Sequence, residues 1–188
     1  LGIVALLVAL RFRETAAERV AANLLGLLGR YRRVIENRRY LLTNMAMGLI
    51  LGPFYGFIAF SSIVYIQIFG LSERAFGLLF GINALMSMAG AFTCTRVIRY
   101  LSDSVLLSVC LVGCTLAGGG ILMAGHWHYL AFAGFMCAIT FFCGMSRPLS
   151  NHLILQQVDR DIGSASSFIV FYQFLVGAVC MRIVTTDW

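Results

Sequence analysis

Side chains that could perform chemistry are scarce in the apolar stretches that dominate this sequence. Those stretches hold no aspartate, glutamate or lysine, and the three histidines, His126, His128 and His152, lie at their edges. No carboxylate pair for acid–base catalysis, no nucleophile beside a base and no phosphate-binding loop can be assembled from them. We therefore expect that the chain is not an enzyme and needs no cofactor.

A metal site is not expected either. His126 and His128 are two residues apart, so their side chains would diverge on a helix. The sequence has no C-x-x-C pair, and Cys110 and Cys114 have no nearby histidine to complete a zinc site. All six cysteines fall within or beside apolar stretches, where cysteine packs as a small apolar side chain.

Arg147 is the one charged side chain deep within an apolar stretch. A charge at membrane depth costs about 2.5 to 3.5 kcal/mol on insertion scales unless it is compensated or reaches the surface. Two interpretations stay open. Arg147 faces a cavity, or the helix ends near Pro148 and the guanidinium reaches the headgroups.

Amides and hydroxyls within the apolar stretches also have two interpretations. They bond neighbouring helices, at about 0.6 to 2 kcal/mol each, or they line a polar cavity. Aromatic rings would give such a cavity a stacking surface for flat apolar compounds. The substrate-cavity candidates are Tyr55, Phe57, Ser61, Asn83, Arg147, Tyr172 and Gln173.

Composition places these residues in a membrane. The chain has 188 residues, of which 60% are apolar and 12% charged, too apolar for a soluble domain of this size. A helix needs about 20 apolar residues to cross the hydrocarbon core. The predicted spans cover about 41–69, 75–95, 105–124, 129–155 and 163–184, and 1–10 is predicted to be the tail of a further transmembrane helix. The prediction is an all-α membrane protein that is a piece of a longer chain.

The first complete span, 41–69, is interrupted by Gly52, Pro53 and Gly56. Proline removes a backbone donor and clashes with the preceding turn, so the helix should bend there. Freed backbone groups persist at membrane depth only where they face protein or a wet cavity. The break therefore favours the wall of a pathway, although the polar residues after it would also suit bonds between helices.

Residues 11–40 form the only sizeable hydrophilic segment. Apolar residues at spacings of three and four between Asn23 and Tyr40, with arginines opposite, predict an amphipathic helix on the membrane surface. Nearly all arginines of the connecting segments fall on the same side as 11–40, which the positive-inside rule places in the cytoplasm. That rule accounts for the net charge of +6, so we expect contact with the lipid bilayer and no binding of nucleic acid.

Small residues recur within the spans. Gly77 with Gly81, and Gly113 with Gly118 to Gly120, are spaced as in helices that approach each other closely. We expect tight helix contacts at these positions.

Three runs occur in order along the spans, namely Pro53-Phe-Tyr-Gly-Phe-Ile-Ala59, Phe76-Gly-Leu-Leu-Phe-Gly-Ile-Asn-Ala-Leu85 and Gly163-Ser-Ala-Ser166. Together they resemble the bicyclomycin-resistance (Bcr/CflA) drug efflux family of the major facilitator superfamily, from the end of the sixth helix through the eleventh of twelve. The resemblance implies a proton-coupled antiporter of a bacterial inner membrane. It would export drugs or small amphipathic compounds by alternating access and so confer drug resistance.

The resemblance also assigns roles to segments. It makes 11–40 the cytoplasmic linker between two halves, and 41–188 the C-terminal bundle without its last helix. The coupling proton would be titrated in the missing N-terminal half of the same polypeptide, so the 188 residues alone would not transport.

Two loops depart from the family pattern. Arg96 and Arg99 look like the remains of a basic loop motif, but Ser102 and Asp103 stand where the family tends to have glycine and proline. Pro148 is followed by Leu149 where the family usually has asparagine, so substrate choice would differ there. Two other functions stay open, a metabolite carrier of the same superfamily and a membrane scaffold or sensor that does not transport.

Overall fold

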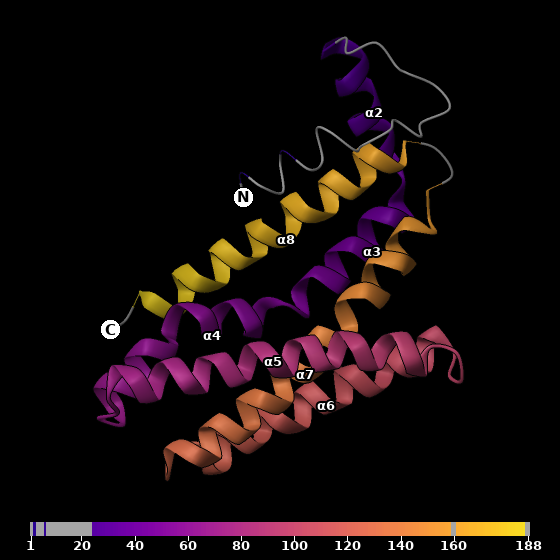
Figure 1. Cartoon of the computed structure of the whole chain (residues 1–188). Coiled ribbons are helices and arrows are strands. Elements are labelled where there is room, and N and C mark those ends of the chain that lie inside the picture. The colour runs from indigo at the N-terminus through magenta and orange to yellow at the C-terminus, as the bar shows by residue number, and fades with distance from the viewer. Residues whose placement is uncertain (1, 3–5, 7–23, 159–160, 187–188) are drawn as a thin grey trace.

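The computed structural model describes residues 2, 6, 24–158 and 161–186, and this part is helical apart from short connections (Figure 1). The predicted helix tail over 1–10, apart from Gly2 and Leu6, and the basic segment up to residue 23 lie outside the described residues. The helices are α2 (Leu24–Glu36), α3 (Arg38–Leu49), α4 (Gly52–Ser62), the π-helical η1 (Ile63–Ile68), α5 (Glu73–Val97), α6 (Asp103–Ala124), α7 (Tyr129–Leu155) and α8 (Ile162–Thr185).

The predicted all-α membrane fold is confirmed. Five stretches of the described chain are helical, long and apolar enough to cross a membrane, and each matches a predicted span to within a few residues. They are Arg38–Ile68, Glu73–Val97, Asp103–Ala124, Tyr129–Leu155 and Ile162–Thr185. The first of them combines α3, α4 and η1.

Capping side chains set several of these helix starts. Ser72 accepts a hydrogen bond from the Ala75 amide at 3.3 Å, and Glu73 follows in the first turn, where a negative charge is favoured. His128 accepts a hydrogen bond from the Leu130 amide through Nδ1 at 3.1 Å. This histidine therefore has a capping role at the start of α7.

The prediction of a single helix between residues 23 and 40 is wrong, because Asn37 divides this stretch into α2 and α3. The Asn37 backbone is extended, and its side chain accepts a hydrogen bond from the Tyr40 amide at 3.2 Å, which caps α3. The apolar face of this region is covered in part, since Val34 and Tyr40 are buried against Ile154 and Ala165. The end of α2 and the start of α3 therefore dock onto α7 and α8.

Polar contacts fasten α2 to the connection between α7 and α8. A carboxylate oxygen of Asp161 lies 3.0 Å from the Arg33 guanidinium, and the other lies 3.6 Å from that of Arg30. Asn37 donates a hydrogen bond to the Gln157 carbonyl at 2.7 Å. Asp161 has φ +60°, in the left-handed region, and this turn presents its carboxylate just before α8 begins.

Helix α7 lies at the centre of the bundle. It packs along α5 and α6, and it also contacts α3, α4 and α8. Helices α4 and α8 also pack closely, and Figure 1 shows these two helices running side by side. The broken first span thus runs between α7 and α8.

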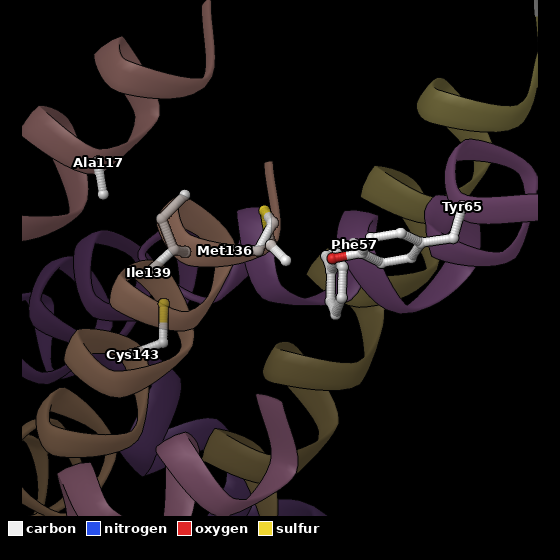
Figure 2. Close-up of a cluster of buried hydrophobic side chains, with 7 residues drawn as sticks. Phe57, Tyr65, Ala117, Met136, Ile139 and Cys143 are labelled. Atoms are coloured by element: carbon white, nitrogen blue, oxygen red, sulfur yellow. The ribbon is translucent and has the colours of Figure 1, made fainter. Parts of the chain in front are cut away.

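One apolar cluster joins the broken span to α7. Phe57 and Tyr65 meet edge to face with ring centroids 6.5 Å apart, and the Tyr65 ring also meets Phe132 of α7 at 5.4 Å. The buried members of the cluster are Phe57, Tyr65, Ala117, Ala133, Met136, Ile139 and Cys143 (Figure 2).

Two glycines allow α5 and α7 to approach closely. A methyl group at Gly90 would overlap the Phe141 carbonyl, and one at Gly144 would overlap the Ser87 carbonyl. Gly113, as expected, lies against a neighbouring helix through the Phe142 ring.

Gly77 and Gly81 make no close helix contact within the described chain. A methyl group at either position would meet nothing within 4 Å, because these glycines do not face a neighbouring helix of the described chain. The same holds for Gly118 and Gly119, whereas Gly120 lies against the Phe135 ring. Spacing alone does not reveal which face of a helix its glycines occupy.

Gly144→Ala should lower the free energy of unfolding by about 1 to 3 kcal/mol, because the new methyl group forces α5 and α7 apart. Gly77→Ala is the matched control, since its site is open and alanine favours a helix by up to about 1 kcal/mol. Thermal unfolding in detergent measures both. Equal effects of the two substitutions would contradict the close crossing.

Candidate functional site

The break in the first span lies at Ile50 and Leu51. Helix α4 starts at Gly52 with Pro53 in its first turn, where the missing N–H is not needed. Cys143 of α7 donates its thiol to the Ile50 carbonyl, with sulfur and oxygen 3.7 Å apart. A neighbouring helix thus covers a carbonyl at the break, as an apolar membrane requires.

A groove of about 640 Å³ lies beside the break. Its one hydroxyl is that of Ser61, which donates to the Ile58 carbonyl of its own helix at 3.4 Å. The lining of the groove is therefore almost wholly apolar, and the groove suits an apolar group of a ligand. It is lined by Leu49, Gly52, Pro53, Gly56, Phe57, Phe60, Ser61, Val64, Gly118, Ile121, Leu122, Phe132, Met136, Ile139, Cys180, Ile183 and Val184.

Tyr55 and Tyr172 each pack against a glycine of a facing helix. Tyr55 of α4 lies against Gly177 of α8, where the absent side chain makes room for the ring. Tyr172 of α8 lies against Gly48 of α3 in the same manner. Its hydroxyl donates to the Met45 carbonyl at 3.3 Å. Both rings therefore join the broken span to α8.

Gln173 and Arg147 lie toward one end of the α7–α8 contact. Gln173 is buried and donates a hydrogen bond to Asn151 of α7 at 3.2 Å. Arg147 lies one turn before Asn151 and is exposed. Helix α7 continues through Pro148 to its end at Leu155, so the helix end expected near Pro148 is wrong. Both positions of the Arg147 guanidinium, in a cavity or at the headgroups, stay open. Arg147 forms no ion pair with another described residue.

Phe57 and Asn83 belong to the interior of the bundle. The Phe57 ring stacks on Phe80 of α5 with centroids 6.0 Å apart. Asn83 donates to the Leu79 carbonyl at 3.0 Å and accepts from the Thr140 hydroxyl at 3.1 Å. Asn83 thus bonds α5 to α7.

The seven cavity candidates do not gather around one site within the described residues. Phe57 and Ser61 border the groove, whereas Tyr55, Tyr172 and Gln173 lie at contacts with α8. The seven sequence candidates also omitted two buried polar groups without hydrogen-bond partners, the Asn44 amide and the Tyr65 hydroxyl.

Each of these two groups has a structural setting of its own. Tyr65 lies in η1, and Figure 2 shows its side chain directed toward Phe57. Asn44 shares the buried face of α3 with Tyr40 and Gly48. Its spacing of four from each was the available signal, because such residues share one face of a helix.

The two arginines of the predicted loop motif lie in the last turn of α5 and in the turn that follows it. The Arg96 guanidinium lies over the Phe92 ring, 4.8 Å from its centroid. Arg99 is exposed in the turn after α5. In the described part of the chain neither side chain forms an ion pair.

Among residues 24–158 and 161–186, no group of histidine, cysteine and carboxylate side chains is arranged to hold a metal ion. The closest cysteine contact is between Cys114 and Cys143, with sulfur atoms 3.9 Å apart. Cys143 also donates a hydrogen bond to the Ile50 carbonyl. The sequence predicted only apolar packing for this cysteine.

Comparison with known proteins decides the family. The sequence pattern of the Major Facilitator Superfamily matches residues 1–181. The chain belongs to this superfamily. Its members are membrane transporters and not enzymes, so the expectation that the chain is not an enzyme is confirmed.

Two curated relatives are distant. The uncharacterized MFS-type transporter YdgK of Bacillus subtilis is 24% identical over 188 residues, which cover 97% of this chain and 46% of YdgK. A bicyclomycin resistance protein homolog of Haemophilus influenzae is 25% identical over 138 residues, covering 72% of this chain and 34% of the relative. The chain thus spans less than half the length of either relative.

Cys143→Ala should lower the free energy of unfolding by about 1 kcal/mol, because it removes the donor to the Ile50 carbonyl at the break. Cys143→Ser keeps a donor and should retain most of the stability. Cys137→Ala, a half-buried position on the same helix, serves as the control for loss of a sulfur atom. If Ala and Ser at position 143 melted at the same temperature, the thiol would not stabilise the break.

Proposed function

We propose that this chain is the C-terminal half-bundle of a drug/proton antiporter similar to the bicyclomycin-resistance family. The observation that carries the proposal is the broken span Arg38–Ile68, packed between α7 and α8 in a chain of the Major Facilitator Superfamily. Discontinuous helices form the substrate and ion sites of many secondary transporters. The relative named a bicyclomycin resistance protein homolog supports a drug as the substrate class.

The side chains of the broken span and α8 favour amphipathic substrates. Tyr55, Phe57 and Tyr172 offer aromatic surface, and Gln173 and Arg147 offer hydrogen-bond donors elsewhere in the same bundle. Apolar walls with a few polar groups are typical of sites for small organic molecules. In this proposal Arg147 faces the substrate pathway, which explains an unpaired charge within a membrane helix.

The coupling proton requires a titratable group outside these spans. The five spans contain no aspartate or glutamate apart from Glu73 and Asp103 at the first residues of α5 and α6. We therefore place the proton-binding carboxylate in an N-terminal half of the same polypeptide. This placement agrees with the partial coverage of both relatives. The 188 residues alone would then not transport.

The arginine distribution supports a cytoplasmic position for residues 11–40. The resemblance supports their role as the link between two halves, and a bacterial inner membrane as the location. Arg33 and Arg30 of this segment pair with Asp161, so the linker is attached to the bundle at its cytoplasmic end.

Expression of the whole gene that contains this chain should raise the tolerance of a pump-deficient bacterium to amphipathic drugs several-fold. An ionophore that collapses the proton gradient should abolish drug export. Growth on single metabolites is measured in parallel. Uptake of a metabolite without any gain in tolerance would favour a metabolite carrier, and no transport of either kind would favour a scaffold or sensor.

Arg147→Ala should reduce drug export by the whole protein about tenfold, equivalent to about 1.4 kcal/mol. The reason is the loss of a cation that lies well inside a membrane helix and has no ion-pair partner in the described chain. Arg74→Ala, at an exposed position in the first turn of α5, is the control. Unchanged export by the Arg147 variant would exclude its role in the pathway.

A further inference from the structure

Helix α3 is a short segment with an irregular joint at each end. It begins after Asn37, whose backbone is extended, and it ends before the break at Ile50 and Leu51. The two neighbours that it contacts within the bundle core are α7 and α8. Segments that move in proteins pivot at such element-terminal residues, so α3 can change its angle without unwinding.

Two hydrogen bonds and a patch of apolar packing, in which Tyr40 is buried against Ala165 and Ile169, hold α3 to α8. Tyr40 donates its hydroxyl to the Ala165 carbonyl at 2.7 Å, and Tyr172 donates to the Met45 carbonyl at 3.3 Å. Next to the second bond, the Tyr172 ring lies against Gly48. Each bond contributes only about 0.5 to 1.5 kcal/mol net where water can take its place, so these two bonds do not by themselves lock the interface.

Asn44 lies between these two attachment points, one helical turn from Tyr40 and one from Gly48. Its side chain is 0% exposed, and neither atom of its amide has a hydrogen-bond partner among the residues that the structure describes. A buried amide in this condition destabilises the conformation that buries it. Asn83 shows the usual alternative, since it is 3% exposed and both atoms of its amide are bonded.

We infer that α3 is a gate, which swings away from α8 about the joint at Ile50 and Leu51, and that Asn44 favours its opening. When α3 moves, the Asn44 amide gains hydrogen bonds with water. The structure described here is the closed state of this interface. The inference rests on the proposed transport function, because alternating access needs two states of similar free energy.

Two matched substitutions in the whole protein test the energetic part. Asn44→Leu removes an unbonded buried amide, so the melting temperature in detergent should rise by about 3 °C. Asn83→Leu removes a bonded amide, so the melting temperature should fall by about the same amount. A fall for both variants would overturn the inference.

Hydrogen exchange measures the opening itself. The backbone amides of residues 38–49 should exchange about tenfold faster than those of 136–145 in α7, because only the former open locally. Asn44→Leu should slow exchange in 38–49 and leave 136–145 unchanged. Equal protection of the two segments, or no effect of the substitution, would contradict a moving α3.

Measurements of drug export distinguish a gating role of Asn44 from an effect on stability alone. Asn44→Leu should reduce export several-fold while it raises the melting temperature, and Asn44→Gln, which retains an amide, should restore export. A more stable variant with unchanged export would overturn the gating role. If the whole protein exports none of the tested drugs, the proposed function fails, and the exchange experiment still decides whether α3 opens.

Discussion

A proline in a membrane helix leaves backbone groups that lipid cannot satisfy, and the arrangement of this bundle follows from that constraint. Pro53 ends one helix and starts the next, so the Ile50 carbonyl lies at the break. The Cys143 thiol of α7 approaches this carbonyl, and the glycines of the broken span lie against α8. The broken span therefore has to run between α7 and α8, and those two helices carry the remaining polar contacts of the site.

Two buried asparagines differ in whether their side-chain amides are hydrogen-bonded. Asn83 joins α5 to α7 through Thr140, at a crossing that Gly90 and Gly144 make close. The hydrogen bond and the close crossing both stabilise the contact between these two helices. Asn44 lies at the contact of α3 with α8, where its amide is unbonded. The bundle thus contrasts a close crossing with bonded polar groups, α5 with α7, and a contact that buries an unbonded amide, α3 with α8.

The sequence predicted the spans well because apolar length is a strong signal, and it located the break because proline has few positions in a helix. The division at Asn37 was missed because the apolar stripe continues past it. The contacts of Cys143, Gly90 and Asn44 depend on how distant helices face each other, which no local pattern encodes. The resemblance identified the superfamily correctly, whereas the drug and the proton remain proposals.

Reconstitution into proteoliposomes tests the central claim, that this chain is one half of a proton-driven exporter. The whole protein and the isolated 188 residues are compared for movement of a fluorescent amphipathic cation under an imposed pH gradient. The account predicts gradient-dependent transport by the whole protein and none by the isolated chain. Transport by the isolated chain, or transport by the whole protein that ignores the gradient, would contradict it.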